Sequence, residues 1–231
     1  MTHQVKLFPG GWRFHQLVLA GLVLLSFKPM EVKAADKEIR DFQVLVDSKP
    51  AGAAKMVFDT QDDGTTSVTS ETDVAVRFLV FSYKYTYRGQ EVWKEGRLQS
   101  LSSSCTDDGK SYQVQGQADQ GVFRLRANNQ ERNVSADIWL SSYWKQPESK
   151  FVNQAISVID CDTGKDLGIR VQFVGPEKRT IGGQAVQVQH YRMAGKIPVD
   201  VWYDGNGRMV RQEWVEQGHR TTVELLRIQR Q

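Results

Sequence analysis

The stretch Val74–Leu98, VAVRFLVFSYKYTYRGQEVWKEGRL, decides the fold. Apolar residues alternate with polar or small ones from Val74 to Val80, which is the period-2 pattern of a half-buried strand. Because Phe81 follows Val80 directly, the alternation continues through Tyr87 on the other parity. A shift of one residue turns every later side chain to the opposite face of a sheet. Without Gly or Pro at the junction, the pattern predicts one long strand that bends or carries a β-bulge there.

The rest of the sequence is typical of short strands separated by turns. Asp, Asn and Gly recur between alternating segments, most clearly at Glu95-Gly96, Asp107–Gly109 and Asp204–Gly207. Regularly spaced strands with such turns indicate an antiparallel sheet, and a long, bent, aromatic strand is suited to a sheet that curls. We therefore expect a mainly β protein with a curled antiparallel sheet or an open half-barrel.

The segment Ser142–Asn153 has a different pattern. Pro147 and Glu148 lie where a helix would begin, and Phe151 and Ala155 are four residues apart, on one helical face. This spacing predicts one or two helical turns, the single short helical segment of the fold.

The N-terminal residues have the pattern of a signal peptide. Basic residues precede the apolar run Leu17–Phe27, and small or aliphatic side chains at Val32 and Ala34 fit a signal-peptidase site. The run is much shorter than the roughly 20 residues that span a bilayer. We expect residues 1–34 to be a signal peptide, residues 35–231 to be a single β-rich domain, and the protein to be periplasmic or secreted. An uncleaved N-terminal anchor is the alternative.

The net positive charge of the chain comes from this predicted signal peptide. Residues 1–34 hold four of the 30 basic and one of the 27 acidic residues, so that 26 of each remain in residues 35–231. Nucleic-acid binding requires a basic face. We therefore do not expect a nucleic acid as a partner.

Two cysteines, Cys105 and Cys161, lie in the part that would be exported. Each precedes a turn, in Cys105-Thr-Asp-Asp-Gly-Lys and Cys161-Asp-Thr-Gly-Lys. Two cysteines in an exported chain favour one disulfide, here across a rim of the sheet. Two free, buried thiols are the alternative.

The serine, histidine and aspartate residues of this sequence lack the surrounding motifs that such residues have in enzymes and metal sites. The serines at Ser102–Ser104 have no nucleophile-elbow glycines, and no phosphate or dinucleotide glycine motif occurs. His190 shares the parity of Val186 and Val188, which favours a structural histidine over a general base. The aspartates lie at turns without the spacing of a calcium loop. We expect no enzyme activity, no cofactor and no metal.

Aromatic residues are the strongest functional signal. Core packing is the usual role of such side chains, but several tyrosines on one face need hydroxyl partners or water, which an amphipathic cavity would supply. Glu91 shares their parity and either faces this interior or is a surface charge. The candidates for lining a ligand site are Phe81, Tyr83, Tyr85, Trp93, Tyr143, Trp144, Phe151 and Trp202.

Several short motifs together resemble a family of exported bacterial proteins with a domain of unknown function. The matching residues are Glu91-Val92-Trp93, Gly96-Arg97-Leu98, Thr106–Lys110, Ser142-Tyr143-Trp144, Asp162-Thr163-Gly164, Val201–Asp204 and Gly207-Arg208. The family is distantly similar to lipoprotein-carrier (LolA/LolB-like) half-barrels, in which a bent antiparallel sheet wraps an apolar cavity. The resemblance implies this fold, and a lipid ligand is implied by fold analogy alone.

Two hypotheses for the function follow. In the first, the curl holds an apolar or amphipathic ligand, plausibly a lipid, under a lid formed by Tyr143–Phe151. In the second, an envelope structural or interaction domain with a solid core docks a partner protein. Convergence of the aromatic side chains on a space of about 300 Å³ or more would favour the first, and interdigitation would favour the second. A hydrolase would require His190 to meet a serine and a carboxylate.

Overall fold

The computed structural model describes residues 36–78 and 81–231, and strands dominate this part of the chain. A single turn of 3₁₀ helix, η1 (Ser149–Phe151), accompanies them. The strands are β1 (Asp36–Val46), β2 (Lys49–Thr60), β3 (Thr66–Phe78), β4 (Phe81–Lys94), β5 (Arg97–Asp107), β6 (Lys110–Asp119), β7 (Val122–Ala127), β8 (Gln130–Ser135), β9 (Trp139–Leu140), β10 (Ala155–Ile156), β11 (Val158–Ile159), β12 (Ile169–Ile181), β13 (Gln184–Ala194), β14 (Val199–Tyr203), β15 (Met209–Glu216) and β16 (His219–Arg230).

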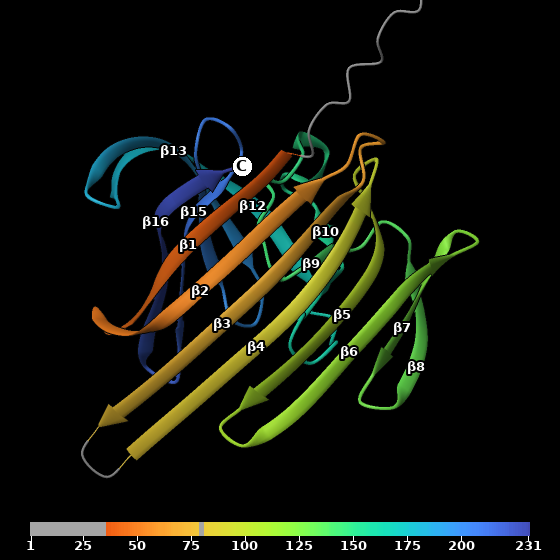
Figure 1. The fold of residues 1–231 in the computed structure, drawn as a ribbon, viewed down its shortest axis with the longest axis horizontal. Coiled ribbons are helices and arrows are strands. Elements are labelled where there is room, and N and C mark those ends of the chain that lie inside the picture. The colour runs from red at the N-terminus through yellow and green to blue at the C-terminus, as the bar shows by residue number, and fades with distance from the viewer. Residues whose placement is uncertain (1–35, 79–80) are drawn as a thin grey trace, which may run out of the picture. The chain divides into compact units, whose positions relative to one another are not determined.

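Fourteen of these strands form one antiparallel sheet. Its order is β10-β12-β13-β14-β15-β16-β1-β2-β3-β4-β5-β6-β7-β8. The pairing of β1 with β16 places the first and the last strand of the chain side by side (Figure 1). Within the described residues β8 and β10 remain at opposite ends, so the sheet does not close into a barrel. The predicted curled antiparallel sheet is confirmed.

The expected long bent strand is instead a hairpin. β3 ends at Phe78, β4 begins at Phe81, and the two strands pair antiparallel along their whole length, with Val74 opposite Tyr85 and Val76 opposite Tyr83. Directly opposite residues point to the same face. In this hairpin, even-numbered residues of β3 lie opposite odd-numbered residues of β4, so the alternating pattern shifts by one residue. A bulge would shift the pattern in the same way. The predicted bend or bulge was therefore wrong. Leu79 and Val80, on which the prediction fell, lie outside the described residues.

Seven of the hairpins are closed by two-residue loops whose residues both have positive φ. This is the signature of the type I′ turn, whose twist matches that of the flanking strands. Glycine, Asn and Asp tolerate the conformation best, which explains the turn residues that the sequence shows. The pairs are Asp47-Ser48, Glu95-Gly96, Asp108-Gly109, Gln120-Gly121, Asn128-Asn129, Gly182-Gly183 and Gln217-Gly218.

Residues 136–168, which we call the inner segment, connect β8 to β12 and contain β9, η1, β10 and β11. β9 and β11 pair parallel to each other, separately from the large sheet. The predicted helix over Ser142–Asn153 is confirmed only as the one turn of η1. Tyr143 has a φ of 44°, which ends any helix there, and its side chain is buried.

The inner segment fills the inside of the sheet between two hydrophobic clusters. The first cluster gathers residues of β12–β16 and β1–β3, and the second gathers residues of β2–β7. Because successive residues of a strand point to opposite faces, Trp139 and Val158 enter the first cluster while Leu140 and Ile159 enter the second. The segment is therefore part of both cores. Among the described residues, no helix is long and apolar enough to cross a membrane.

Candidate functional site

Two predicted candidates, Trp93 of β4 and Trp144 of the inner segment, meet at the carboxylate of Glu91. Both indole Nε1 groups donate to Glu91 Oε2, each at 2.8 Å. The two indole rings pack edge to face with centroids 5.9 Å apart, and Trp144 also packs against Phe58 at 5.3 Å. One carboxylate thus fastens the inner segment to the sheet.

Glu91 is fully inside the protein, with 1 % of its surface exposed. Its Oε1 has no hydrogen-bond partner in the described part of the chain. Burial raises the pKa of Glu91, because the charged form loses its hydration, while the nearby Ser142 side chain and the indoles of Trp144 and Trp93 act in the opposite direction. Of the two roles considered for Glu91, the structure supports the interior one.

The space beside this cluster is too small for a ligand. It is bordered by Trp93, Trp139, Tyr143 and Trp144 among other residues, and its volume is about 20 Å³. That is room for about one water molecule. Tyr143 is itself buried in the first cluster, and its backbone carbonyl accepts a hydrogen bond of 2.9 Å from the hydroxyl of Tyr203.

Tyr83 and Tyr85 lie on the neighbouring part of β4 and are partly buried. The Tyr85 hydroxyl donates to both carboxylate oxygens of Asp162 in the inner segment, at 3.0 Å each. Burial, followed by the nearby charge of Asp160, raises the pKa of Asp162 to about 7, although the hydrogen bond from Tyr85 lowers it. This contact is a second polar link between the sheet and the inner segment.

Trp202 lies in the first cluster and has ring contacts of its own. His190 stacks on its ring at 4.5 Å, the guanidinium of Arg179 covers it at 4.2 Å, and its Nε1 donates to Glu177. His190 Nε2 is 2.8 Å from Asp200 Oδ1. His190 therefore has a charge partner and a stacking partner, as expected for a structural histidine.

The last two aromatic candidates are Phe151 and Phe81. Phe151 is half-buried on the first cluster, where it packs against Trp139 at 5.7 Å. Phe81 begins β4, but its side chain lies outside the described residues. The candidates whose side chains are described are thus divided between two packed clusters. Phe58 and Trp139 belong to the same packing, and sequence reasoning missed them because neither continues the alternating pattern of Val74–Tyr87.

Both cysteines are buried, free thiols, and the predicted disulfide is absent from the structure. They lie in the second cluster as apolar side chains. Burial raises the pKa of Cys105 to about 12, so that its reactive thiolate is scarce at neutral pH. Among the described residues, no group of His, Cys, Asp or Glu side chains is arranged to hold a metal ion.

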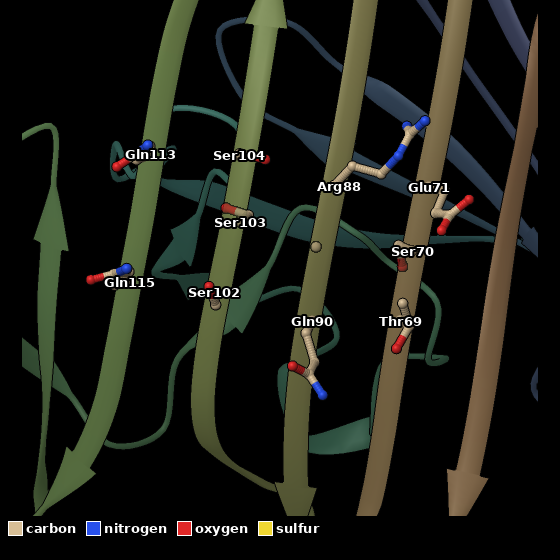
Figure 2. Close-up of a pocket in the computed structure, with 11 residues that line it drawn as sticks. Thr69, Ser70, Glu71, Arg88, Gln90, Ser102, Ser103, Ser104, Gln113 and Gln115 are labelled. Carbon is tan, nitrogen blue, oxygen red and sulfur yellow. The ribbon is translucent and has the colours of Figure 1, made fainter.

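A larger hollow lies elsewhere, on the polar face of β3–β6. Two rows of side chains cross the four strands, and the backbone of Ser70, Gly89 and Ser103 lies between them (Figure 2). The volume is about 380 Å³. We call this hollow the polar groove; its rows are Thr69, Gln90, Ser102 and Gln115 on one side and Glu71, Arg88, Ser104 and Gln113 on the other.

Arg88, the basic side chain of the polar groove, is paired with a carboxylate beside it. Arg88 lies directly opposite Glu71 in the sheet register. Its Nη2 donates to Asp73 at 2.8 Å, and its Nη1 donates to the backbone carbonyls of Thr72 and Tyr87. The remaining wall side chains are amides and hydroxyls. Sequence reasoning missed the groove because its rows form only when four strands align in one register.

With this geometry established, comparison with known proteins identifies the family. The family model described as "Domain of unknown function (DUF6134)" matches residues 42–226. The chain therefore belongs to this family. No curated protein matches it.

Two solved structures were compared with this fold. A beta-barrel-like protein of the domain of unknown function DUF1849 from Brucella abortus superposes with a TM-score of 0.57 at 6 % identity, covering 85 % of this chain and 98 % of that one. A protein from Bacteroides fragilis NCTC 9343, described as a "putative exported protein with YmcC-like fold", gives a TM-score of 0.32 at 10 % identity, covering 83 % and 95 %. The first likeness supports the barrel-like fold.

Proposed function

We propose that this member of the DUF6134 family is a non-enzymatic, exported structural or interaction domain that binds a partner on its outer surface. One observation carries the proposal: Trp93 and Trp144 converge on Glu91 and leave about 20 Å³ between the sheet and the inner segment. Sites for small molecules have volumes of about 300–1,000 Å³. The inside of the curl is thus occupied by the chain itself.

The non-enzymatic part of the proposal is supported by the contacts of the candidate groups. His190 is engaged by Asp200 and Trp202, and the hydroxyl of Ser103 donates to the carbonyl of Cys161 at 2.6 Å. These contacts explain both residues without a reaction. The export part of the proposal is supported by the leader pattern of residues 1–34.

The hypothesis of an apolar ligand requires an empty space inside the curl. A lipid in the curl would require the inner segment to leave, because Leu140 and Ile159 occupy the second cluster and Trp139 and Val158 the first. Removing such side chains from a core exposes apolar surface at a cost of about 25 cal/mol per Å². A bound lipid would have to compensate for this loss.

Native mass spectrometry distinguishes the two hypotheses. The full chain would be expressed with its own N-terminal residues, purified under mild conditions and incubated with phospholipid vesicles. Its mass would be measured before and after solvent extraction. A lipid-carrier protein handled in parallel serves as the positive control. We expect the ligand-free mass in every sample. A stoichiometric adduct of lipid mass that extraction removes would overturn the proposal and support an apolar ligand.

A further inference from the structure

The polar groove has a volume of about 380 Å³, against about 20 Å³ beside Glu91, and the packed core does not use it. We propose that it binds a segment of a neutral glycan chain. This inference rests on the proposed function, because it names the chemistry of the partner that the outer surface would bind.

The shape of the polar groove suits an extended polar chain. Its two rows run across β3, β4, β5 and β6 (Figure 2). Neighbouring strands are about 4.8 Å apart, so three spacings give a length of about 14 Å. Rows two residues apart along a strand are separated by about 7 Å. The groove is therefore a trough with side-chain walls and a backbone floor.

The walls supply hydrogen-bonding groups of both kinds. Gln90, Gln113 and Gln115 each present an amide with donors and an acceptor, and Ser102 and Ser104 present hydroxyls that do both. All five side chains are exposed. Sugar hydroxyls and acetamido groups likewise both donate and accept, so a glycan can satisfy these walls along its length.

The charge of the polar groove argues against the other classes of ligand. Arg88 is paired with Asp73, and the Glu71 carboxylate lies opposite it in the register, which leaves no free cation in the walls for a phosphate, a nucleic acid or an acidic lipid headgroup. The walls carry no aromatic or aliphatic side chain that would attract an apolar ligand. Six of the eight wall side chains are amides and hydroxyls, so the chemistry of the walls fits an uncharged, hydroxyl-rich chain best.

The test is a two-dimensional NMR titration of the full chain, labelled with ¹⁵N, with chitohexaose and with maltohexaose. We expect saturable shifts for at least one of the two probes, confined to the amides of residues around the polar groove. A Gln113→Ala/Gln115→Ala double variant should weaken the affinity about tenfold, since each amide contributes a modest net hydrogen bond. Ser102→Leu, which fills the trough, should abolish the shifts.

The control is Gln117→Ala, on the same face of β6 but outside the polar groove. It should leave the affinity unchanged. An equal loss in this control, shifts centred elsewhere, or no shift at about 10 mM of either probe would overturn the inference. A photo-cross-linking residue placed at Ser102 offers a further readout. Capture of a partner protein there, without any glycan response, would also overturn the inference, but it would leave the proposed function standing. A lipid adduct in the mass spectrum would instead contradict the proposed function.

Discussion

At the scale of the residue, Glu91 explains why the aromatic side chains pack as they do. A carboxylate in a core is stable only when its oxygens are hydrogen-bonded or when it takes up a proton. Glu91 Oε2 receives the indoles of Trp93 and Trp144, while Oε1 has no partner within the described residues. The same carboxylate that joins the two tryptophans therefore also carries a buried oxygen without a partner.

Replacing Glu91 by Ala should be strongly destabilising. The buried indole N–H of Trp93 and the half-buried one of Trp144 would lose their acceptor, and each unsatisfied donor costs about 1–3 kcal/mol, so we expect a total loss of about 2–6 kcal/mol. Glu91→Gln retains an oxygen for both indoles and should cost less than about 1.5 kcal/mol. Urea unfolding at pH 7 measures both. The exposed neighbour Gln90, changed to Ala, is the control, with an expected change within about 0.5 kcal/mol.

Equal losses for the Ala and Gln variants would contradict this role of Glu91. So would a loss in the Ala variant no larger than that of Gln90→Ala, because the carboxylate would then contribute little to holding the two tryptophans.

At the scale of the element, part of the sheet could be predicted and part could not. The turns at Glu95-Gly96 and Asp108-Gly109 were predictable because their positive φ values require particular residues. The reversal between Phe78 and Phe81 was not, because Leu79-Val80 has no turn residue and the parity change is the same for a bulge. The polar groove depends on the register between separate hairpins, which no local pattern encodes.

The inner segment is an element that binds the sheet through titratable groups. Asp162 faces Tyr85 of β4, and Asp160 and Asp107 are the acidic groups that act on it. Its pKa rises from 3.8 to about 7 on folding, so the folded state holds a proton that the unfolded state releases. The contribution of Asp162 to stability is therefore present below about pH 4 and is lost as the pH rises to about 7.

Asp162→Asn should remove this pH dependence. The amide cannot ionise and still offers an oxygen to Tyr85, so relative to the wild type the variant should gain stability between pH 5 and pH 8. Unfolding free energies measured in urea at both pH values test this. Asp108→Asn, at an exposed turn position with a φ of 44°, is the matched control and should follow the wild type. A parallel pH dependence in Asp162→Asn and the wild type would show that Asp162 does not take up the proton.

At the scale of the whole molecule, the central claim is that the curled sheet is filled by its own chain. The residue pattern predicted the curl correctly, because alternation and turn chemistry are local. It could not predict the filling, because β9 and β11 are only two residues long. Their place inside the sheet depends on packing between distant parts of the sequence.

Hydrogen exchange of the inner segment tests this claim most directly. The amides of Trp139 and Ser141 donate to the carbonyls of Ser157 and Ile159, at 3.2 and 3.0 Å, along the β9–β11 pair whose side chains enter the two clusters. If the segment is core, these amides should exchange within about tenfold of the slowest amides of β4, since both open only when the domain unfolds. Exchange about a thousandfold faster than in β4 would identify a segment that opens by itself, and would contradict the account.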